Sequence, residues 1–445
     1  MSKTFRRIFS IMITSILTFG LFAACTPAGN GDNPNAPYTK KGSIKILSIS
    51  NSYGDDSVKY LWSLLKATGR YDEIIVGHLY RGGCDIDTHY DYITKGTKGY
   101  RYYYNDSGDY SWRANVSSNE AIASQDWDII VTAQASAKTY DSNSFSNAQP
   151  LLDKFKELAT NPDVKICWNM TWCYQTVGAE YGGSQTSFMT NVFNNIKNTI
   201  APMGDIAAVI PSGTVIQDLR SSYIGNTLNR DGSHLELGIA SYSVGLAWLG
   251  AITGYNTDNM QWTPDDQPEV KARLNVIKEC VKNALNKPFE ITNSQYTESD
   301  GLDFTKDSVI INAIGKDFSA YKTAEIEWMK GKWYNYKRDK STPSTSNFYY
   351  CTQLYTPETL PVGSIIVVDD LYSVMPVKFK DTDTLDPDQN AARYDCHLSA
   401  EKIIIVDEAF WNNNKFVTFN ISHYSDELNL SYMNEGGIRI YVPKN

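Results

Sequence analysis

Histidine is scarce in this sequence: only five occur in 445 residues, so any chemistry that needs an imidazole has few candidates. The seven cysteines form neither a CxxC pair nor a cluster with histidine at zinc-site spacing, which argues against a zinc domain. Basic residues are outnumbered, because 41 Lys and Arg stand against 50 Asp and Glu and the formal net charge is −9. A nucleic acid is therefore not an expected partner. No repeat of fixed period and no low-complexity tract occurs.

Aromatic residues are what the sequence has in excess, with 30 Tyr and 10 Trp. These side chains are flat and half-polar, so their number is consistent with recognition surfaces. The remaining composition, 42% hydrophobic and 20% charged, is that of a globular protein and excludes wholesale disorder. The length predicts two or three domains.

The first 24 residues have the pattern of a secretory signal peptide. Three basic residues precede a short apolar stretch at 8–24, and small Ala23 and Ala24 stand before Cys25. The run LFAAC resembles a bacterial lipoprotein processing site, which implies lipidation of Cys25 and a membrane anchor in the cell envelope. The alternative is a plain signal peptide in which Cys25 is coincidental. Residues 25–43 lack large aliphatic side chains and are expected to be a flexible tether.

Residues 44–288 alternate short β-branched runs with segments of helical period. The expected strands are 44–50, 74–79, 128–132, 164–168 and 206–210. The expected helices are 55–66, 150–159, 187–200, 235–252 and 270–285. This alternation predicts an α/β domain with a mostly parallel sheet and helices on both faces. Residues 90–116, rich in Tyr and Gly, are expected to be a loop or hairpin inserted after the second strand.

Residues 289–445 have a different texture and predict a second, all-β domain like a sandwich or barrel. Short apolar runs separated by Asn, Asp, Gly and Pro are expected as strands at 308–315, 363–370, 402–408, 415–422, 428–433 and 438–443. Cys351 and Cys396 in this region could form a disulfide, or both could be buried thiols like the other cysteines of the body. Four aromatic residues could bind carbohydrate or pack against the first domain: Trp328, Trp333, Tyr334 and Tyr336.

The carboxyl ends of parallel strands are where ligands bind in such sheets. The first expected strand ends at Ser50, and Ser52 follows it at the start of a helix. Free backbone N–H groups and the helix dipole there suit a nucleophile whose attack creates an oxyanion. The alternative is a capping box between Ser52 and Asp55.

A serine nucleophile needs a base, and His234 is the favoured candidate among the five histidines. His78 lies in a strand, His89 lies near the Tyr-rich insert, and His397 and His423 lie in the β region. His234 ends the sequence Asp-Gly-Ser-His, a turn that can fold Asp231 back onto one imidazole nitrogen. The alternative is a capping box between Ser233 and Glu236.

These motifs, in this order, resemble the SGNH (GDSL-like) hydrolases over residues 44–285, in a branch found in bacterial lipoproteins. The quoted segments are ISNSYGDD, RGGCDIDTH, WDIIVTAQAS and NRDGSHL. The resemblance implies a three-layer α/β/α, flavodoxin-like domain with Ser52 as nucleophile, His234 as base and Asp231 as its orienting acid. Gly82-Gly83 match the family's second block, whose backbone N–H joins the oxyanion hole. The third block offers Gln134 where the family has Asn.

The resemblance implies acyl transfer without a metal or organic cofactor. Backbone N–H groups of Ser52 and Gly83 and the amide of Gln134 would stabilise the oxyanion. Family members commonly remove acetyl or other small acyl groups from carbohydrates, so an acylated carbohydrate is the expected substrate. The Tyr-rich insert could wall the site or cover the domain junction. Two other hypotheses remain open: a catalytically degenerate scaffold that binds glycan at the cell surface, and a purely structural surface protein.

Overall fold

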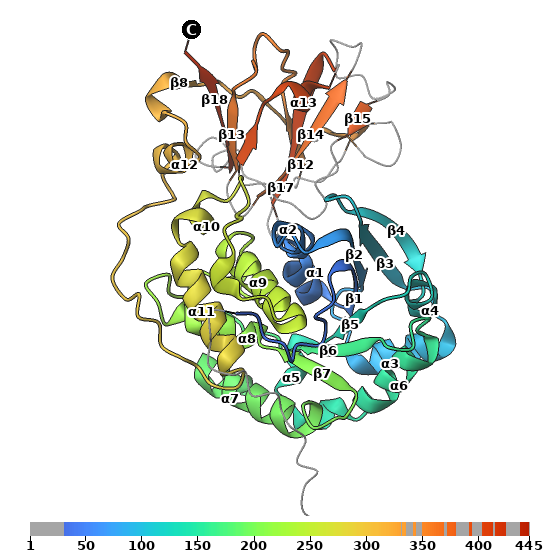
Figure 1. Cartoon of the computed structure of the whole chain (residues 1–445). Helices are drawn as coiled ribbons and strands as arrows, with labels where there is room; N and C mark the ends of the chain where they lie inside the picture. Colours follow the sequence, from blue (N-terminus) through green and yellow to red (C-terminus); the bar gives the residue numbers. More distant parts are fainter. Residues whose placement is uncertain are drawn as a thin grey trace, which may run out of the picture.

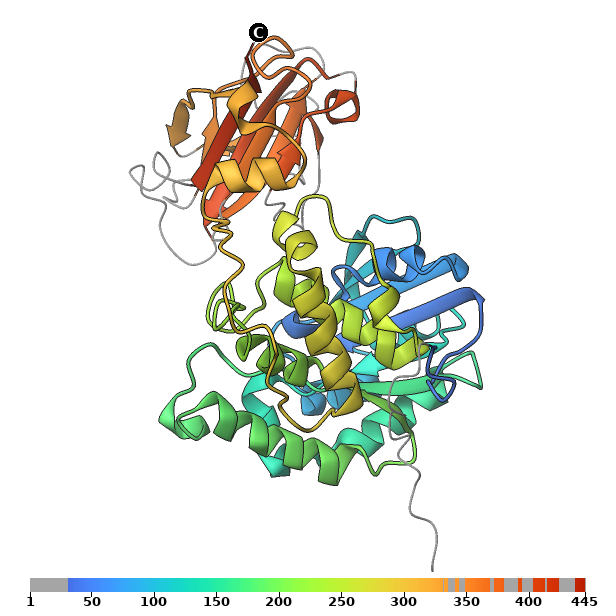
Figure 2. The same ribbon diagram turned by 60° about the vertical axis from the view of Figure 1, so that its left-hand side comes forward.

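The computed structural model consists of an α/β domain and a separate β-rich domain (Figures 1 and 2). It describes residues 31–330, 332–334, 341–343, 349–368, 372–379, 391–393, 403–412, 414–423 and 437–444. The expected signal peptide and Cys25 lie outside these residues, so both stay predictions. None of the helices in the described ranges is both long and apolar enough to cross a bilayer.

A seven-stranded sheet forms the middle layer of the α/β domain, in the order β4-β3-β2-β1-β5-β6-β7. Its strands are β1 (Gly42–Ser50), β2 (Tyr71–Tyr80), β3 (Tyr100–Asn105), β4 (Ser111–Val116), β5 (Ile129–Thr132), β6 (Lys165–Asn169) and β7 (Ile206–Ile210). The five strands from β2 to β7 in this order are parallel. This is the flavodoxin-like order, and it places a topological switch point between β1 and β5. The expected fold class is confirmed.

Alternate residues of β1 face two separate cores. Ile44 and Ile46 contact the core under one layer of helices, while Leu47 and Ile49 contact the core under the other. The first layer consists of α1 (Ser52–Val58), α2 (Leu61–Ala67), α8 (Ser212–Arg220), α9 (Ile239–Thr253), α10 (Pro268–Ala272) and α11 (Leu274–Asn286). The second layer consists of α3 (Ile86–Lys95), α4 (Ser118–Ile122), α6 (Ala148–Leu158) and α7 (Gln185–Asn195).

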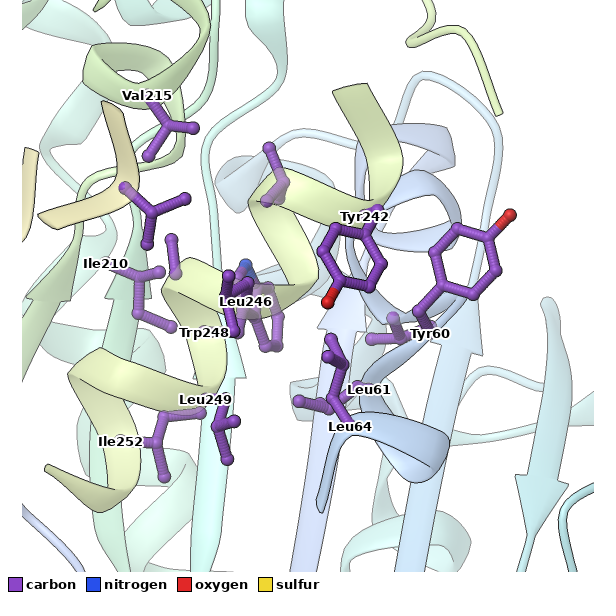
Figure 3. Packing of buried hydrophobic residues seen from close by; sticks show 14 of the residues in the cluster. Tyr60, Leu61, Leu64, Ile210, Val215, Tyr242, Leu246, Trp248, Leu249 and Ile252 are labelled. Atoms are coloured by element: carbon purple, nitrogen blue, oxygen red, sulfur yellow. The ribbon is translucent and has the colours of Figure 1, made fainter. Parts of the chain in front are cut away.

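Helix α9 is the centre of the first core, as Figure 3 shows. It is apolar on all sides, which is typical of a buried helix. Tyr242 lies beside Tyr60 and the α2 leucines, while Ile252 lies on the side of Ile210 at the end of β7. Gly245 allows close approach, because a Cβ there would lie 3.1 Å from Leu64 Cδ1. This packing fixes the α1–α2 pair, which carries Ser52, on the sheet.

Several boundaries differ from the sequence prediction. The helix expected at 55–66 is the pair α1 and α2, and the one expected at 270–285 is split into α10 and α11. Helix α9 begins at Ile239, four residues later than expected. The cause is the carboxylate of Glu236, which accepts hydrogen bonds from the backbone N–H groups of Ile239 and Ala240 at 3.1 and 3.0 Å.

Part of the segment expected as a tether, at residues 31–43, contacts the α/β domain. Asn33 N donates to Gly254 O at 2.7 Å, and Tyr38 N donates to Ile252 O at 3.0 Å. Tyr38 is buried, and β1 begins at Gly42. The described part of this segment therefore docks on the end of α9.

The Tyr-rich insert is mainly sheet and core. Residues 90–95 belong to α3, and β3 and β4 form a hairpin whose strand β3 pairs antiparallel with β2, the last strand of the parallel part of the sheet. Tyr100, Tyr102 and Tyr103 are buried. Because they are buried, these three tyrosines stabilise the sheet edge and do not present their ring faces to a ligand.

The β-rich domain is a sandwich of two antiparallel sheets, as expected. Their orders are β15-β14-β17-β12-β9 and β16-β13-β18-β8, and β10 and β11 form a separate pair. The strands are β8 (Tyr321–Thr323), β9 (Trp328–Lys330), β10 (Lys332–Tyr334), β11 (Ser341–Pro343), β12 (Tyr349–Thr352), β13 (Ile365–Val368), β14 (Tyr372–Phe379), β15 (Ala391–Arg393), β16 (Ile403–Ile405), β17 (Phe416–His423) and β18 (Ile438–Pro443). Side chains of both sheets, such as Ile366 and Phe419, share one core, and the short α13 (Glu408–Trp411) contributes to it.

One expected strand of this domain is a helix. Residues 308–313 of the expected strand belong to α12 (Asp307–Ala313), whose Ile310 and Ile311 pack on the outer face of β13. Trp328 is partly buried against the core of its own sandwich domain, and not against the first domain as one of the two alternatives had it. The side chains of Trp333, Tyr334 and Tyr336, and all of Cys396, lie outside the described residues. The disulfide between Cys351 and Cys396 therefore stays a prediction.

Candidate active site

Ser52 is the first residue of α1, and only Asn51 separates it from β1, the strand beside the switch point of the sheet. Asn51 caps the helix, because its Oδ1 accepts a hydrogen bond from Tyr53 N at 3.0 Å. The alternative of a cap made by Ser52 is therefore wrong. The Ser52 hydroxyl is available for other contacts at the carboxyl edge of the sheet.

The structure brings Ser52, His234 and Asp231 together. Ser52 Oγ lies 2.8 Å from His234 Nε2, and His234 Nδ1 lies 2.6 Å from Asp231 Oδ2. When Nδ1–H donates to the carboxylate, Nε2 has a lone pair for the serine hydroxyl. All three side chains remain partly accessible. This is the geometry of a serine nucleophile, a general base and an orienting acid.

The carboxylate of Asp231 is well supplied with donors. Oδ1 accepts the backbone N–H groups of Ser233 and His234 at 3.0 and 2.8 Å. Partial burial alone would raise the pKa of Asp231, but these bonds and the imidazole outweigh it and lower the pKa to about 2. Asp231 is therefore ionised whenever it orients His234 near neutral pH.

The loop that carries Asp231 and His234 is held by its neighbours. Ser233 O accepts hydrogen bonds from Trp172 Nε1 at 2.9 Å and from Asn229 Nδ2 at 3.0 Å. Trp172 is fully buried and stacks on Tyr53 at 4.3 Å between ring centroids. The loop is thus fixed to the residue that follows the nucleophile. The alternative of a Ser233–Glu236 capping box is wrong, because Ser233 contacts Asp231 instead.

Asp56 and Arg230 form a second link between α1 and this loop, and the sequence prediction missed both. Asp56 Oδ1 accepts Arg230 Nη1 at 2.8 Å, and its Oδ2 accepts Leu235 N at 2.9 Å. Only 2% of Asp56 is exposed. Burial raises the pKa of Asp56, although Arg230 and His234 oppose that shift. The one signal in the sequence was a carboxylate one helical turn after Ser52.

The loop after β2 contains the expected oxyanion-hole glycine. Gly83 has φ of +62°, and the turn is closed by a hydrogen bond from Cys84 N to Arg81 O at 3.2 Å. Asn51 Nδ2 donates to Cys84 O at 2.9 Å, so this loop is tied to the start of α1. The positive φ explains the glycine at position 83.

Gln134 follows β5 as expected, but its amide is used inside the protein. Its Nε2 donates to Ser144 O at 2.7 Å, and its Oε1 accepts Ala135 N and Ile86 N at 2.8 and 3.2 Å. The side chain is completely buried. These bonds connect the start of α3 with the short helix α5 (Ser136–Thr139). The structure therefore gives Gln134 a supporting place in the fold rather than that of an oxyanion donor.

The two other histidines whose side chains the structure describes, His78 and His89, are buried in the fold. His78 is fully buried, with Nε2 3.0 Å from Asp55 Oδ1. His89 is buried against Tyr100, with 2.8 Å between Nδ1 and the tyrosine hydroxyl. His397 and the side chain of His423 lie outside the described residues. Among the described residues, no group of three or more His, Cys, Asp or Glu side chains could hold a metal ion.

Comparison with known proteins gives a family for the α/β domain. A family model described as "Domain of unknown function (DUF4886)" matches residues 45–284. The crystal structure of a DUF4886 family protein from Bacteroides uniformis is 29% identical, with a TM-score of 0.52. The match covers 56% of this chain and 98% of that one. A protein from Slackia heliotrinireducens, described as "a putative SGNH hydrolase", is 15% identical with a TM-score of 0.32, over 47% of this chain and 99% of that one. No curated protein matches significantly.

Proposed function

The chain belongs to the DUF4886 family, and we propose that it is a serine ester hydrolase of the SGNH type. The observation that carries this proposal is the chain of contacts from Ser52 Oγ through His234 to Asp231, at 2.8 and 2.6 Å. The switch point of a flavodoxin-like sheet is also the usual place for a ligand. Geometry of this kind is shared by serine hydrolases on unrelated folds.

In the proposed reaction, Ser52 Oγ attacks the ester carbonyl while His234 Nε2 takes its proton. Ionised Asp231 keeps the imidazole oriented and stabilises the imidazolium. The backbone N–H groups of Ser52 and Gly83 would bind the oxyanion. The imidazolium then protonates the leaving alcohol, and water cleaves the acyl-enzyme with His234 again as base.

The substrate and cellular location belong to the same proposal. A signal peptide and a lipid on Cys25 would hold the enzyme at the bacterial cell envelope, where glycans are abundant. We therefore propose an acetyl or other small acyl group on a carbohydrate as the substrate. The alternative function, a degenerate scaffold that binds glycan, is favoured by the engaged amide of Gln134, which leaves one expected oxyanion donor unassigned.

A panel of small chromogenic acetyl esters and acetylated glycans tests the proposal. The wild-type protein should turn over at least one of them, and Ser52→Ala should abolish that turnover without a change in melting temperature. Glycan binding that persists in Ser52→Ala, with no wild-type turnover, would support the degenerate scaffold instead.

A further inference from the structure

We propose that Asp56 and Arg230 are a positioning pair that holds the nucleophile helix against the loop of the base. This inference rests on the proposed hydrolase function. Neither residue touches the reacting atoms, so the proposed action is through Ser52 and His234.

Asp56 lies on the same face of α1 as the nucleophile. It follows Ser52 by four residues, so the two side chains lie on one face of the helix, one turn apart. This face meets the loop twice: Ser52 Oγ contacts His234 at 2.8 Å, and Asp56 Oδ2 accepts Leu235 N at 2.9 Å. Adjacent residues of the loop therefore contact successive turns of the helix.

Arg230 closes the loop at its base. Arg230 N donates to His234 O at 3.0 Å, and its Nη1 donates to Leu235 O as well as to Asp56. One guanidinium thus binds both the helix and the far end of the loop. A planar, always charged guanidinium can do this with fixed geometry, whereas a lysine ammonium is a point charge on a flexible stem.

The carboxylate of Asp56 is buried. A carboxylate that is only 2% exposed is costly unless it is paired and hydrogen-bonded, and Asp56 has both Arg230 and Leu235 N. Its carboxylate oxygens accept from Arg230 and from Leu235 N, which both lie on the loop of the base. The pair therefore fixes the distance between two side chains that lie 182 residues apart in the sequence.

The test compares Asp56→Asn with Asp300→Asn. Asp300 forms an ion pair of the same length with Arg273, also 2.8 Å, outside the candidate site. Asp56→Asn should lower kcat on the ester that the wild type hydrolyses by about 100-fold, with KM unchanged, at a temperature where it is fully folded. Asp300→Asn should keep the wild-type kcat. Arg230→Lys should recover part of the activity that Arg230→Gln loses.

A double variant separates positioning from general stability. In the His234→Ala background, Asp56→Asn should have no further effect on the residual rate, because the geometry that it supports is already lost. A wild-type kcat in Asp56→Asn with only a lower melting temperature would overturn the proposal. So would an equal loss of rate in both backgrounds.

A readout without turnover separates this inference from the proposed function. In a crystal structure of Asp56→Asn, Ser52 Oγ and His234 Nε2 should have moved beyond hydrogen-bond reach. An unchanged 2.8 Å distance would overturn the positioning role, even if the wild type hydrolysed no ester. Absence of wild-type turnover with a displaced Ser52 in the variant would overturn only the hydrolase.

Discussion

His234 Nε2 lies 2.8 Å from Ser52 Oγ, although 182 residues separate them in the sequence. The contact joins the start of α1, just after the first strand, to the loop before α9. Because residues this distant in the sequence must be held together by the fold, the proposed hydrolase function depends on this contact.

Asp231→Asn tests the role of the orienting acid. Loss of the charge should lower kcat by about 10⁴-fold, because Nδ1–H of His234 loses the acceptor that fixes the tautomer. Steady-state kinetics on the ester hydrolysed by the wild type measures this.

The folded pKa of Asp231, about 2, lies below the ordinary value of about 3.9, so the unfolded chain binds more protons between these pH values. Asp231 therefore stabilises the fold above about pH 4, and this stabilisation is lost as the pH falls towards 2.

Gly83→Ala tests the loop expected to bind the oxyanion. The substitution places a Cβ at φ +62° and should cost about 1 kcal/mol of stability. It should also lower kcat by about 100-fold, because the backbone N–H is displaced. Gly96→Ala is the matched control, with φ +63° at the end of α3 and likewise no atom within 4 Å of the new Cβ. Equal kcat in both variants, at similar melting temperatures, would contradict the role of Gly83 N–H as an oxyanion donor.

Gln134→Glu tests whether the buried amide supports the fold. The carboxylate keeps the acceptor for Ile86 N and Ala135 N but loses the bond to Ser144 O, at a cost of about 1–3 kcal/mol. Chemical denaturation of the variant should show this loss. A much lower kcat with unchanged stability would instead indicate that the amide of Gln134 donates to the oxyanion.

Asp218 predicts a pH dependence that is unrelated to the site. Burial raises the pKa of Asp218 to about 8, although Thr292 N donates to it at 2.7 Å. The folded protein then binds more protons than the unfolded chain between about pH 4 and 8, so this group makes stability fall as the pH rises through that window. Asp218→Asn should raise the melting temperature at pH 8 and have little effect near pH 4. A constant difference across this range would contradict the assigned shift.

The sheet domain was predictable because its strands are β-branched runs separated by helical segments. Helix α12 was not predictable, because a short apolar run such as VII at 309–311 is compatible with a helix as well as with a strand. Its Ile310 and Ile311 are buried by a sheet that forms from later parts of the chain. The burial of the tyrosines in the insert likewise depends on the pairing of β3 with β2, which the local sequence does not specify.

Within the candidate site, scarce histidine made His234 identifiable, and the turn Asp-Gly-Ser-His identified Asp231. Asp56 was missed because its partner Arg230 lies 174 residues away, so only the folded chain shows that the carboxylate is buried. The position of Gln134 was predicted, but the direction of its amide was not. That direction depends on Ser144 O and Ile86 N, which local sequence does not specify.

Covalent labelling by a fluorophosphonate, followed by mass spectrometry, tests the central claim most directly. The probe needs no knowledge of the substrate, because it reacts with a serine that an adjacent base activates. We predict a single adduct on Ser52, which is absent from Ser52→Ala and forms far more slowly in His234→Ala. No adduct on the folded wild-type protein, or an adduct rate that is unchanged in His234→Ala, would contradict it.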